Sequence, residues 1–374
     1  MDYDDPHDSG NSPDFIDINH DDAQEDTSFE PLDFIYNKEP EKSPRNDLPV
    51  LNLDIRDCWH IEDLYCDGLF YVEQDESQPI ELDDKHAILS WAAYKLSSSP
   101  TARAMLAEAE EEGWAVALES LEGPDFHLDV PEKLIVIDDQ DLLTSALGRS
   151  EYFKNAVLAS FIRALRDVWQ EKRHGAFDTD YGPEAVMHLE RVRAADLDVL
   201  TILVAWELRG EGQPSLWRHM IGAQEGDIAM RFSGYLERDP SALFNGKALA
   251  EAFSQWFRDE ERVNACDHET LNYLDTIVQG GNASFGQKKL TPVGLEVLSC
   301  LPDKTAYLQE KGHDLLRDPF YSGLGDPINQ AHFMQILYDI KVVRIHDIPF
   351  RDADLASKIF PGGEFTPDNK GTIH

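Results

Sequence analysis

The polar residues between positions 163 and 174 have a spacing that could support chemistry. Arg163, Asp167, Gln170 and His174 follow one another at intervals of four, three and four residues. On a helix these positions share one face, so their side chains can act together. Imidazoles and carboxylates at such positions bind metal ions in helical metal sites. Here an arginine precedes an acid by four residues, which favours an ion pair between Arg163 and Asp167.

A second helical stretch supplies another carboxylate, Asp196, which we expect to pair with Arg163 or Arg166. Arginine is cationic at every accessible pH and cannot ligate a metal, and two acids without an imidazole make a poor zinc site. Ca²⁺ or Mg²⁺ would need further oxygen ligands. The alternative interpretation is an ordinary amphipathic helix whose polar residues form a solvent-facing stripe.

Two helices must position these side chains. The first runs from Ser150, a predicted N-cap, to Gly175, a residue that suits a helix end. The second covers residues 194–210 and is apolar on nearly every face, which predicts a buried position. Apolar periodicity predicts further helices over 84–97, 101–112, 214–222, 227–237, 245–265 and 267–278, a strand over 114–121, and one or two strands within 126–138. We expect an α+β, mostly helical fold with a small sheet packed on the long central helix.

This order of elements resembles a minimal zincin, the core of a zinc peptidase, in which the long helix carries His-Glu-x-x-His. Residues 163–170, Arg-Ala-Leu-Arg-Asp-Val-Trp-Gln, resemble the His-Glu-Leu-Arg-His-x-Trp-Gln version of that motif. Residues 193–196, Arg-Ala-Ala-Asp, are similar to the Arg-Glu-Ala-Asp start of the helix that supplies the third ligand. Residues 99–275 also resemble a bacterial putative metallopeptidase domain family of unknown function.

The resemblance implies a role for each position of the motif, and this chain departs from it at each one. Arg163 and Asp167 stand at two ligand positions, Ala164 at the catalytic base and Ala194 at the third ligand. Alanine can neither bind a metal nor accept a proton. We therefore expect no zinc hydrolysis and no cofactor, with Zn²⁺ as the alternative.

Composition limits the partners. The formal net charge of −39 argues against nucleic acid and anionic membranes and favours basic partners. The 4 cysteines are too few for a disulfide framework, and the first residues lack the basic start and apolar run of a signal peptide, so we expect a cytoplasmic protein.

We expect four parts, which are a disordered acidic tail (1–48), an arm (49–84), a zincin-like domain (85–280) and a C-terminal appendage with a mobile tail (281–374).

Three functional hypotheses follow. The first is a catalytically degenerate metallopeptidase-like protein that binds a peptide or protein, through an edge strand within residues 114–138. The second is an active metal-dependent hydrolase with unconventional ligands among Asp167, Asp196, His174 and His188. The third is an acidic interaction scaffold that acts through its terminal segments.

Overall fold

The structure is a computed structural model of the chain, and it describes residues 57–66, 82–121, 123–174, 180–279, 285–286 and 288–346. All of these residues belong to one compact unit that spans residues 39–374. The predicted disordered tail at 1–48 and the predicted mobile tail at 360–374 lie outside the described residues. Among the described residues, no helix is both long and apolar enough to cross a membrane.

The described part of the chain forms one four-stranded sheet with the order β1-β2-β4-β3. β2 runs parallel to β4, whereas the two outer strands pair antiparallel with their neighbours. β2 and β4 have buried residues at four consecutive positions each, a pattern typical of strands covered on both faces. The strands are β1 (Trp59–His60), β2 (Ala115–Glu119), β3 (Phe126–Asp129) and β4 (Leu134–Asp138).

Two of the helices before the long central pair, at residues 85–96 and 100–111, start at side-chain caps. The Asp84 carboxylate accepts a hydrogen bond from the backbone N–H of Ala87 at 2.7 Å, and the Ser99 hydroxyl accepts one from the N–H of Ala102 at 3.0 Å. Both are the short polar residues that satisfy free N–H groups at helix starts. These elements are α2 (Ile61–Cys66), α3 (Lys85–Leu96), α4 (Pro100–Glu111) and the short α5 (Thr144–Arg149).

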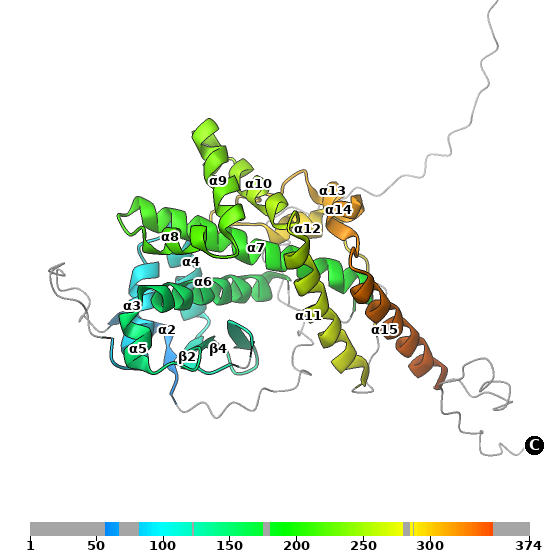
Figure 1. The fold of residues 1–374 in the computed structure, drawn as a ribbon, viewed down its shortest axis with the longest axis horizontal. Helices are drawn as coiled ribbons and strands as arrows, with labels where there is room; N and C mark the ends of the chain where they lie inside the picture. Colours follow the sequence, from blue (N-terminus) through cyan, green and yellow to red (C-terminus); the bar gives the residue numbers. More distant parts are fainter. Residues whose placement is uncertain are drawn as a thin grey trace, which may run out of the picture. The chain divides into compact units, whose positions relative to one another are not determined.

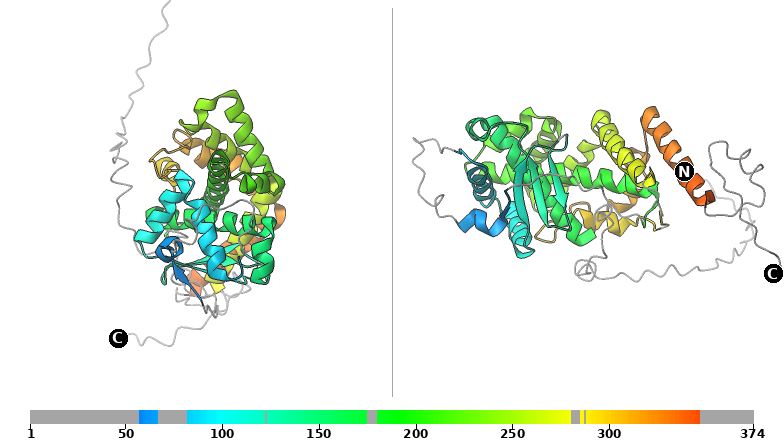
Figure 2. Two further views of the ribbon diagram at one scale, coloured as in Figure 1. Left: turned by 90° about the vertical axis from the view of Figure 1, so that its left-hand side faces the viewer. Right: turned by 90° about the horizontal axis from the view of Figure 1, so that it is seen from below.

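Two long helices, α6 (Glu151–His174) and α7 (Pro183–Gly210), lie side by side through the middle of the described unit (Figure 1). α6 packs against β3 and β4 on one side and against α7 on another, and the strands are seen beside it from below (Figure 2). α6 therefore has a face toward the sheet and a face toward α7. Side chains from both helices and from the start of β3 can meet there.

The remaining helices surround α7. They are α8 (Ser215–Gly222), α9 (Gly226–Arg238), the 3-10 helix η3 (Pro240–Leu243), α10 (Lys247–Trp256), α11 (Glu260–Gln279), α12 (Pro292–Leu298), α13 (Gly312–Arg317), α14 (Pro319–Ser322) and α15 (Pro327–His346). α11 and α15 form a buried apolar cluster with the start of α7, which includes Val186, Leu271, Leu274 and Ile336.

The α+β prediction with a small sheet on a long central helix is confirmed, and the range 126–138 holds two strands. Two boundaries differ. α7 begins at Pro183, well before residue 194, because proline is favoured in the first helical turn. The predicted helix over 245–265 is divided, because the Asp259 carboxylate accepts hydrogen bonds from the N–H groups of Glu261 and Arg262 and so starts a new helix there.

Candidate functional site

Arg163, at the first ligand position of the motif, is held by three carboxylates from three other segments. Its Nε donates to Asp198 of α7 at 2.9 Å and its Nη1 donates to Asp125, just before β3, at 3.3 Å. Its Nη2 donates to Glu225, which lies between α8 and α9. One guanidinium thus joins the segment before β3 to α7 and to the segment between α8 and α9.

The charges around Arg163 do not balance, since three carboxylates face one cation. Burial raises the pKa of Asp198, and the nearby Glu225 raises it further, while Arg163 opposes the rise. The indole N–H of Trp256 donates to the second oxygen of Asp198 at 2.9 Å and also favours its ionised form. Arg163 is therefore required to keep this group of acids together.

Asp167, at the second ligand position, accepts a hydrogen bond from the guanidinium of Arg193 on α7. Both side chains are almost fully buried. Ala164, at the position of the base, is completely buried and offers no proton acceptor. Ala194, at the third ligand position, is half-buried and offers no ligand atom.

Asp196 lies in a separate polar centre with no solvent exposure. Arg166 donates to both of its oxygens, at 2.7 and 3.2 Å, and the Tyr307 hydroxyl donates to it at 2.6 Å. The side-chain amide of Gln170 donates to the same carboxylate. Burial raises the pKa of Tyr307 well above its ordinary value, and the charge of Asp196 adds to the rise. This centre is a charge-assisted network with bidentate geometry, a form that stabilises a buried carboxylate strongly.

The predicted pair between Arg163 and Asp167 is wrong, because α7 presents a closer partner of opposite charge to each residue. The predicted contact of Asp196 with the first helix is confirmed for Arg166. Sequence reasoning did not find five of the partners, which are Asp125, Asp198, Glu225, Arg193 and Tyr307. Spacing could have pointed to two of them. Asp198 follows Ala194 by four residues and lies on the helix face turned to α6, and Arg193 directly precedes Ala194.

Three of the four ligands considered for an active hydrolase have described side chains, and these three do not form a metal site. Asp167 and Asp196 belong to different ion pairs, and His188 is buried beside Arg191 and hydrogen-bonded to the backbone of Leu315. The side chain of His174 lies outside the described residues. Within the described residues, no group of three His, Cys, Asp or Glu side chains is arranged to hold a metal ion.

A zinc ion therefore does not fit the motif as this chain presents it. Arg163 offers only donor groups, and the carboxylate of Asp167 is engaged by a second cation. Zinc needs three or four neutral imidazole or anionic ligands around one point. In this chain the two ligand positions are occupied by Arg163, with its three carboxylate partners, and by Asp167, with Arg193.

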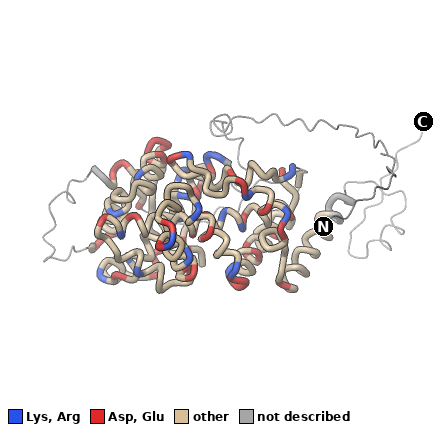
Figure 3. The backbone as a smooth tube through the Cα atoms, turned by 90° about the horizontal axis from the view of Figure 1, so that it is seen from above, with Lys and Arg blue, Asp and Glu red and all other residues tan. Residues whose placement is uncertain are grey.

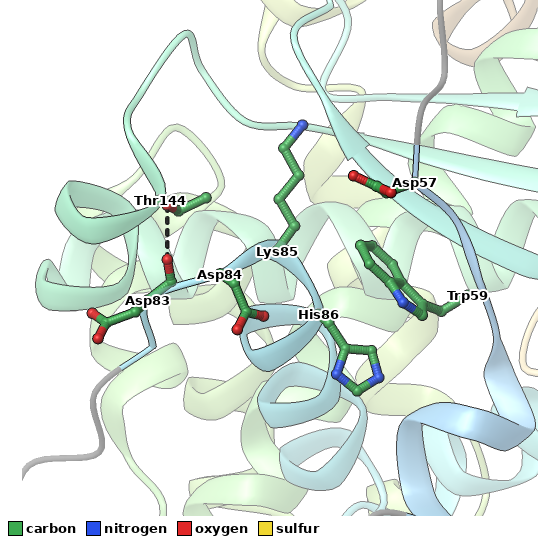
Figure 4. Close-up of a pocket in the computed structure, with 7 residues that line it drawn as sticks. All are labelled: Asp57, Trp59, Asp83, Asp84, Lys85, His86 and Thr144. Carbon is green, nitrogen blue, oxygen red and sulfur yellow. Dashed lines mark hydrogen bonds between the residues drawn. The ribbon is translucent and has the colours of Figure 1, made fainter.

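A shallow pocket lies elsewhere, where β1 meets the start of α3 (Figure 4). It has a volume of about 420 Å³ and is lined by Asp57, Trp59, Asp83, Asp84, Lys85, His86 and Thr144. Asp84 is already used as the cap of α3, and Lys85 bonds to Glu119 at 2.8 Å. The pocket is not connected with any residue of the motif. Acidic and basic residues both occur along much of the described backbone (Figure 3).

The geometry defines an α+β domain in which a long helix, covered by a second one, lies beside a mixed sheet whose antiparallel edge strand, among the described residues, is β3. The chain belongs to the putative metallopeptidase family DUF6782, whose model matches residues 75–308. The matched range is wider than the range 99–275 over which we expected the resemblance, and it crosses the expected domain boundary at residue 280. Arg166 likewise donates hydrogen bonds across that boundary, to the carbonyls of Leu298 and Cys300. No curated protein and no solved structure is significantly similar to the chain.

Proposed function

We propose that this protein is a catalytically inactive member of the metallopeptidase family that binds an extended peptide segment along β3. The observation that carries the proposal is the position of β3, which is an antiparallel edge strand and starts beside Arg163. A peptide on this edge would lie next to the place where a peptidase of this design holds its metal. The chain keeps the docking edge and lacks the reacting groups.

The hydrogen-bond pattern of β3 supports this proposal. The N–H of Asp138 donates to the carbonyl of Asp125 at 3.0 Å, and Phe126 stands opposite Ile137 in the register. In an antiparallel ladder, hydrogen-bonded pairs alternate with pairs whose peptide groups point outward. The peptide groups of Phe126 and Leu128 therefore point away from β4. An added strand gains its affinity from such outward groups.

The loss of catalysis follows from the residues of α6. Peptide hydrolysis by this motif needs a base that takes a proton from water, and Ala164 has no such group. It also needs a Lewis acid, and the ligand positions are engaged by Arg193 and by three acids around Arg163. Binding without turnover is the function compatible with these side chains.

The test uses the full chain and a phage-displayed octapeptide library. Selected peptides are synthesised and their affinity is measured by fluorescence anisotropy for wild type, Phe126→Pro and Phe126→Ala. Proline removes an N–H that points away from β4, so the sheet keeps its own ladder while the edge loses a donor. We expect at least a tenfold weaker affinity for Phe126→Pro, and a smaller change for Phe126→Ala, which keeps the N–H.

Two results would contradict the proposal. If selected peptides bind Phe126→Pro as well as wild type, with both proteins folded by circular dichroism, β3 is not the binding edge. If the purified chain contains stoichiometric zinc, or cleaves casein in a manner that EDTA abolishes, the protein is an active enzyme. Substoichiometric metal and an unchanged casein pattern are the expected outcomes.

A further inference from the structure

We propose that the outer face of α15 is a dimerisation surface, on which a second copy of this chain packs its own α15 in the antiparallel direction. The surface, which we call the α15 stripe, is formed by Ile328, Ala331, Met334, Gln335 and Tyr338. It shares no residue with β3, so the inference goes beyond peptide binding at the edge strand and does not depend on it.

α15 has a buried face and an exposed face, and both are apolar. The inner face packs on α11, the only described helix with which α15 has an extensive contact, and there Ile336 and Ile340 are buried. On the outer face Ile328, Met334 and Tyr338 are 73%, 65% and 41% exposed. No other helix or strand among the described residues exposes more than one large apolar side chain. Figure 1 shows α15 at one end of the described unit, with α11 on one side of it. An exposed apolar surface of this kind is typical of an interaction site.

The spacing of the stripe fits a second helix of the same sequence. Ile328, Ala331, Gln335 and Tyr338 follow one another at intervals of three, four and three residues, the spacing of the positions at which two helices of a coiled coil meet. In an antiparallel pair with a two-fold axis midway between Ile328 and Tyr338, each Ile328 lies opposite Tyr338 of the second copy, and each Ala331 lies opposite Gln335. The two copies then use the same surface and make every contact twice, as in a two-fold symmetric dimer.

The polar side chains in and beside the stripe already have partners within the chain. The amide of Gln335 donates to both oxygens of Asp339, at 2.9 and 3.0 Å. The amide of Gln330 donates to the carbonyl of Leu324 at 2.6 Å. A buried polar group lowers affinity when it loses its hydrogen bonds. These groups keep their internal bonds when a second helix covers the stripe, so the cost of removing water from them is small.

Charge identifies the partner as a second copy. Residues 327–338 contain no Asp, Glu, Lys or Arg, whereas such residues make up 28% of the whole chain, which has a formal net charge of −39. Two copies therefore repel each other over most approaches, and this repulsion is screened only beyond about 8 Å at physiological salt. The stripe brings no charged side chain of residues 327–338 to the contact. A basic partner would need acids within its binding surface, and those residues supply none.

The experiment measures self-association of the full chain by sedimentation velocity at increasing protein concentration. We expect a monomer–dimer equilibrium, and Ile328→Glu should weaken the dimer at least about tenfold, because it places a carboxylate within an apolar contact. The matched control is Met230→Glu, which adds the same charge at an exposed apolar position of α9 and should leave the equilibrium unchanged.

A second variant tests the antiparallel arrangement. Adding Tyr338→Lys to Ile328→Glu should restore the dimer, because the two-fold axis places the new carboxylate of one copy opposite the new ammonium group of the other. The two substituted positions are too far apart on one helix to pair within a single chain. In a parallel pair, like charges would face each other and the double variant would stay dissociated.

The outcomes are distinct. A wild-type chain that is monomeric at every concentration would overturn the proposal. So would a dimer that Ile328→Glu weakens no more than Met230→Glu, since its interface would then lie elsewhere. Loss of the dimer without recovery in the double variant, with all proteins folded by circular dichroism, would show that the antiparallel arrangement is wrong. None of these results bears on peptide binding by β3.

Discussion

Replacement of Arg166 by methionine should destabilise the domain strongly, and the structure allows the cost to be worked out. Arg166 and Asp196 both have no exposed side-chain surface. Methionine fills a similar length but leaves the Asp196 carboxylate buried with only Tyr307 and Gln170 as donors. Breaking a buried ion pair from one side costs about 3–5 kcal/mol, because the remaining charge is not compensated.

The carbonyl groups released by the same substitution add to this cost. Arg166 donates to the backbone carbonyls of Cys300 and Leu298, both at 3.0 Å. Each buried acceptor left without a donor costs about 1–3 kcal/mol unless water replaces it. We therefore expect Arg166→Met to lose at least about 4 kcal/mol, and the melting temperature to fall by roughly 10 °C. Urea unfolding followed by circular dichroism at pH 7 measures the first quantity.

Two comparisons make the result decisive. Arg231→Met breaks the partly exposed pair with Glu251 and should cost less than about 1 kcal/mol. The double variant Arg166→Met/Asp196→Leu removes both buried charges and should be more stable than Arg166→Met alone. An Arg166→Met protein that loses no more than Arg231→Met, or a double variant with strictly additive losses, would refute the view that a buried charge pair joins α6 and α7 to residues 298–307.

The other predictions concern groups outside this pair. Arg163→Ala should destabilise the fold by about 3 kcal/mol, and less at pH 5 than at pH 8, because the acids whose repulsion it offset can take up protons at the lower pH; equal losses at both pH values by urea unfolding would argue against the acid group. His188 has its pKa lowered to about 4, first by burial and then by Arg191, so the fold favours the neutral form and loses stability as pH falls from 6.5 toward 4. At pH 5 this loss is about 2 kcal/mol. His188→Gln should remove that part of the acid sensitivity, whereas the same change at exposed His313 should not; matching pH profiles for the two variants would exclude the mechanism.

The elements of the core could be predicted from local patterns, but the partners within the site could not. The bounds of α6 follow from an uninterrupted apolar periodicity that ends at Gly175, and the strands follow from runs of branched residues. Arg163 shows the limit of this reasoning. An exposed i, i+4 pair with Asp167 would contribute only about 0.3–0.5 kcal/mol, and the structure offers three carboxylates that lie 35, 38 and 62 residues away in the sequence.

The same limit explains why the sequence predicts an arginine partner for Asp196 but does not identify which arginine it is. The sequence gives it two candidate arginines one helical turn apart, Arg163 and Arg166, and local spacing does not choose between them. The choice depends on Tyr307 and on the carbonyls near residue 300, which approach from a segment more than 100 residues away. Only the packing of that segment on α6 makes Arg166 the buried partner.

The buried motif positions and the start of β3 differ in how fully their charges are compensated. Where the motif positions are buried, each charge has an opposite partner within the chain, as in Arg166 with Asp196 and Arg193 with Asp167. Such pairing is required there, because removing one partner of a buried ion pair lowers the free energy of unfolding by ~3–5 kcal/mol. At the start of β3, Asp125 is 61% exposed, and it shares the charge of Arg163 with Asp198 and Glu225. An excess of acid at an exposed position costs little stability. Its negative field lies at the end of the strand along which we propose that a peptide binds.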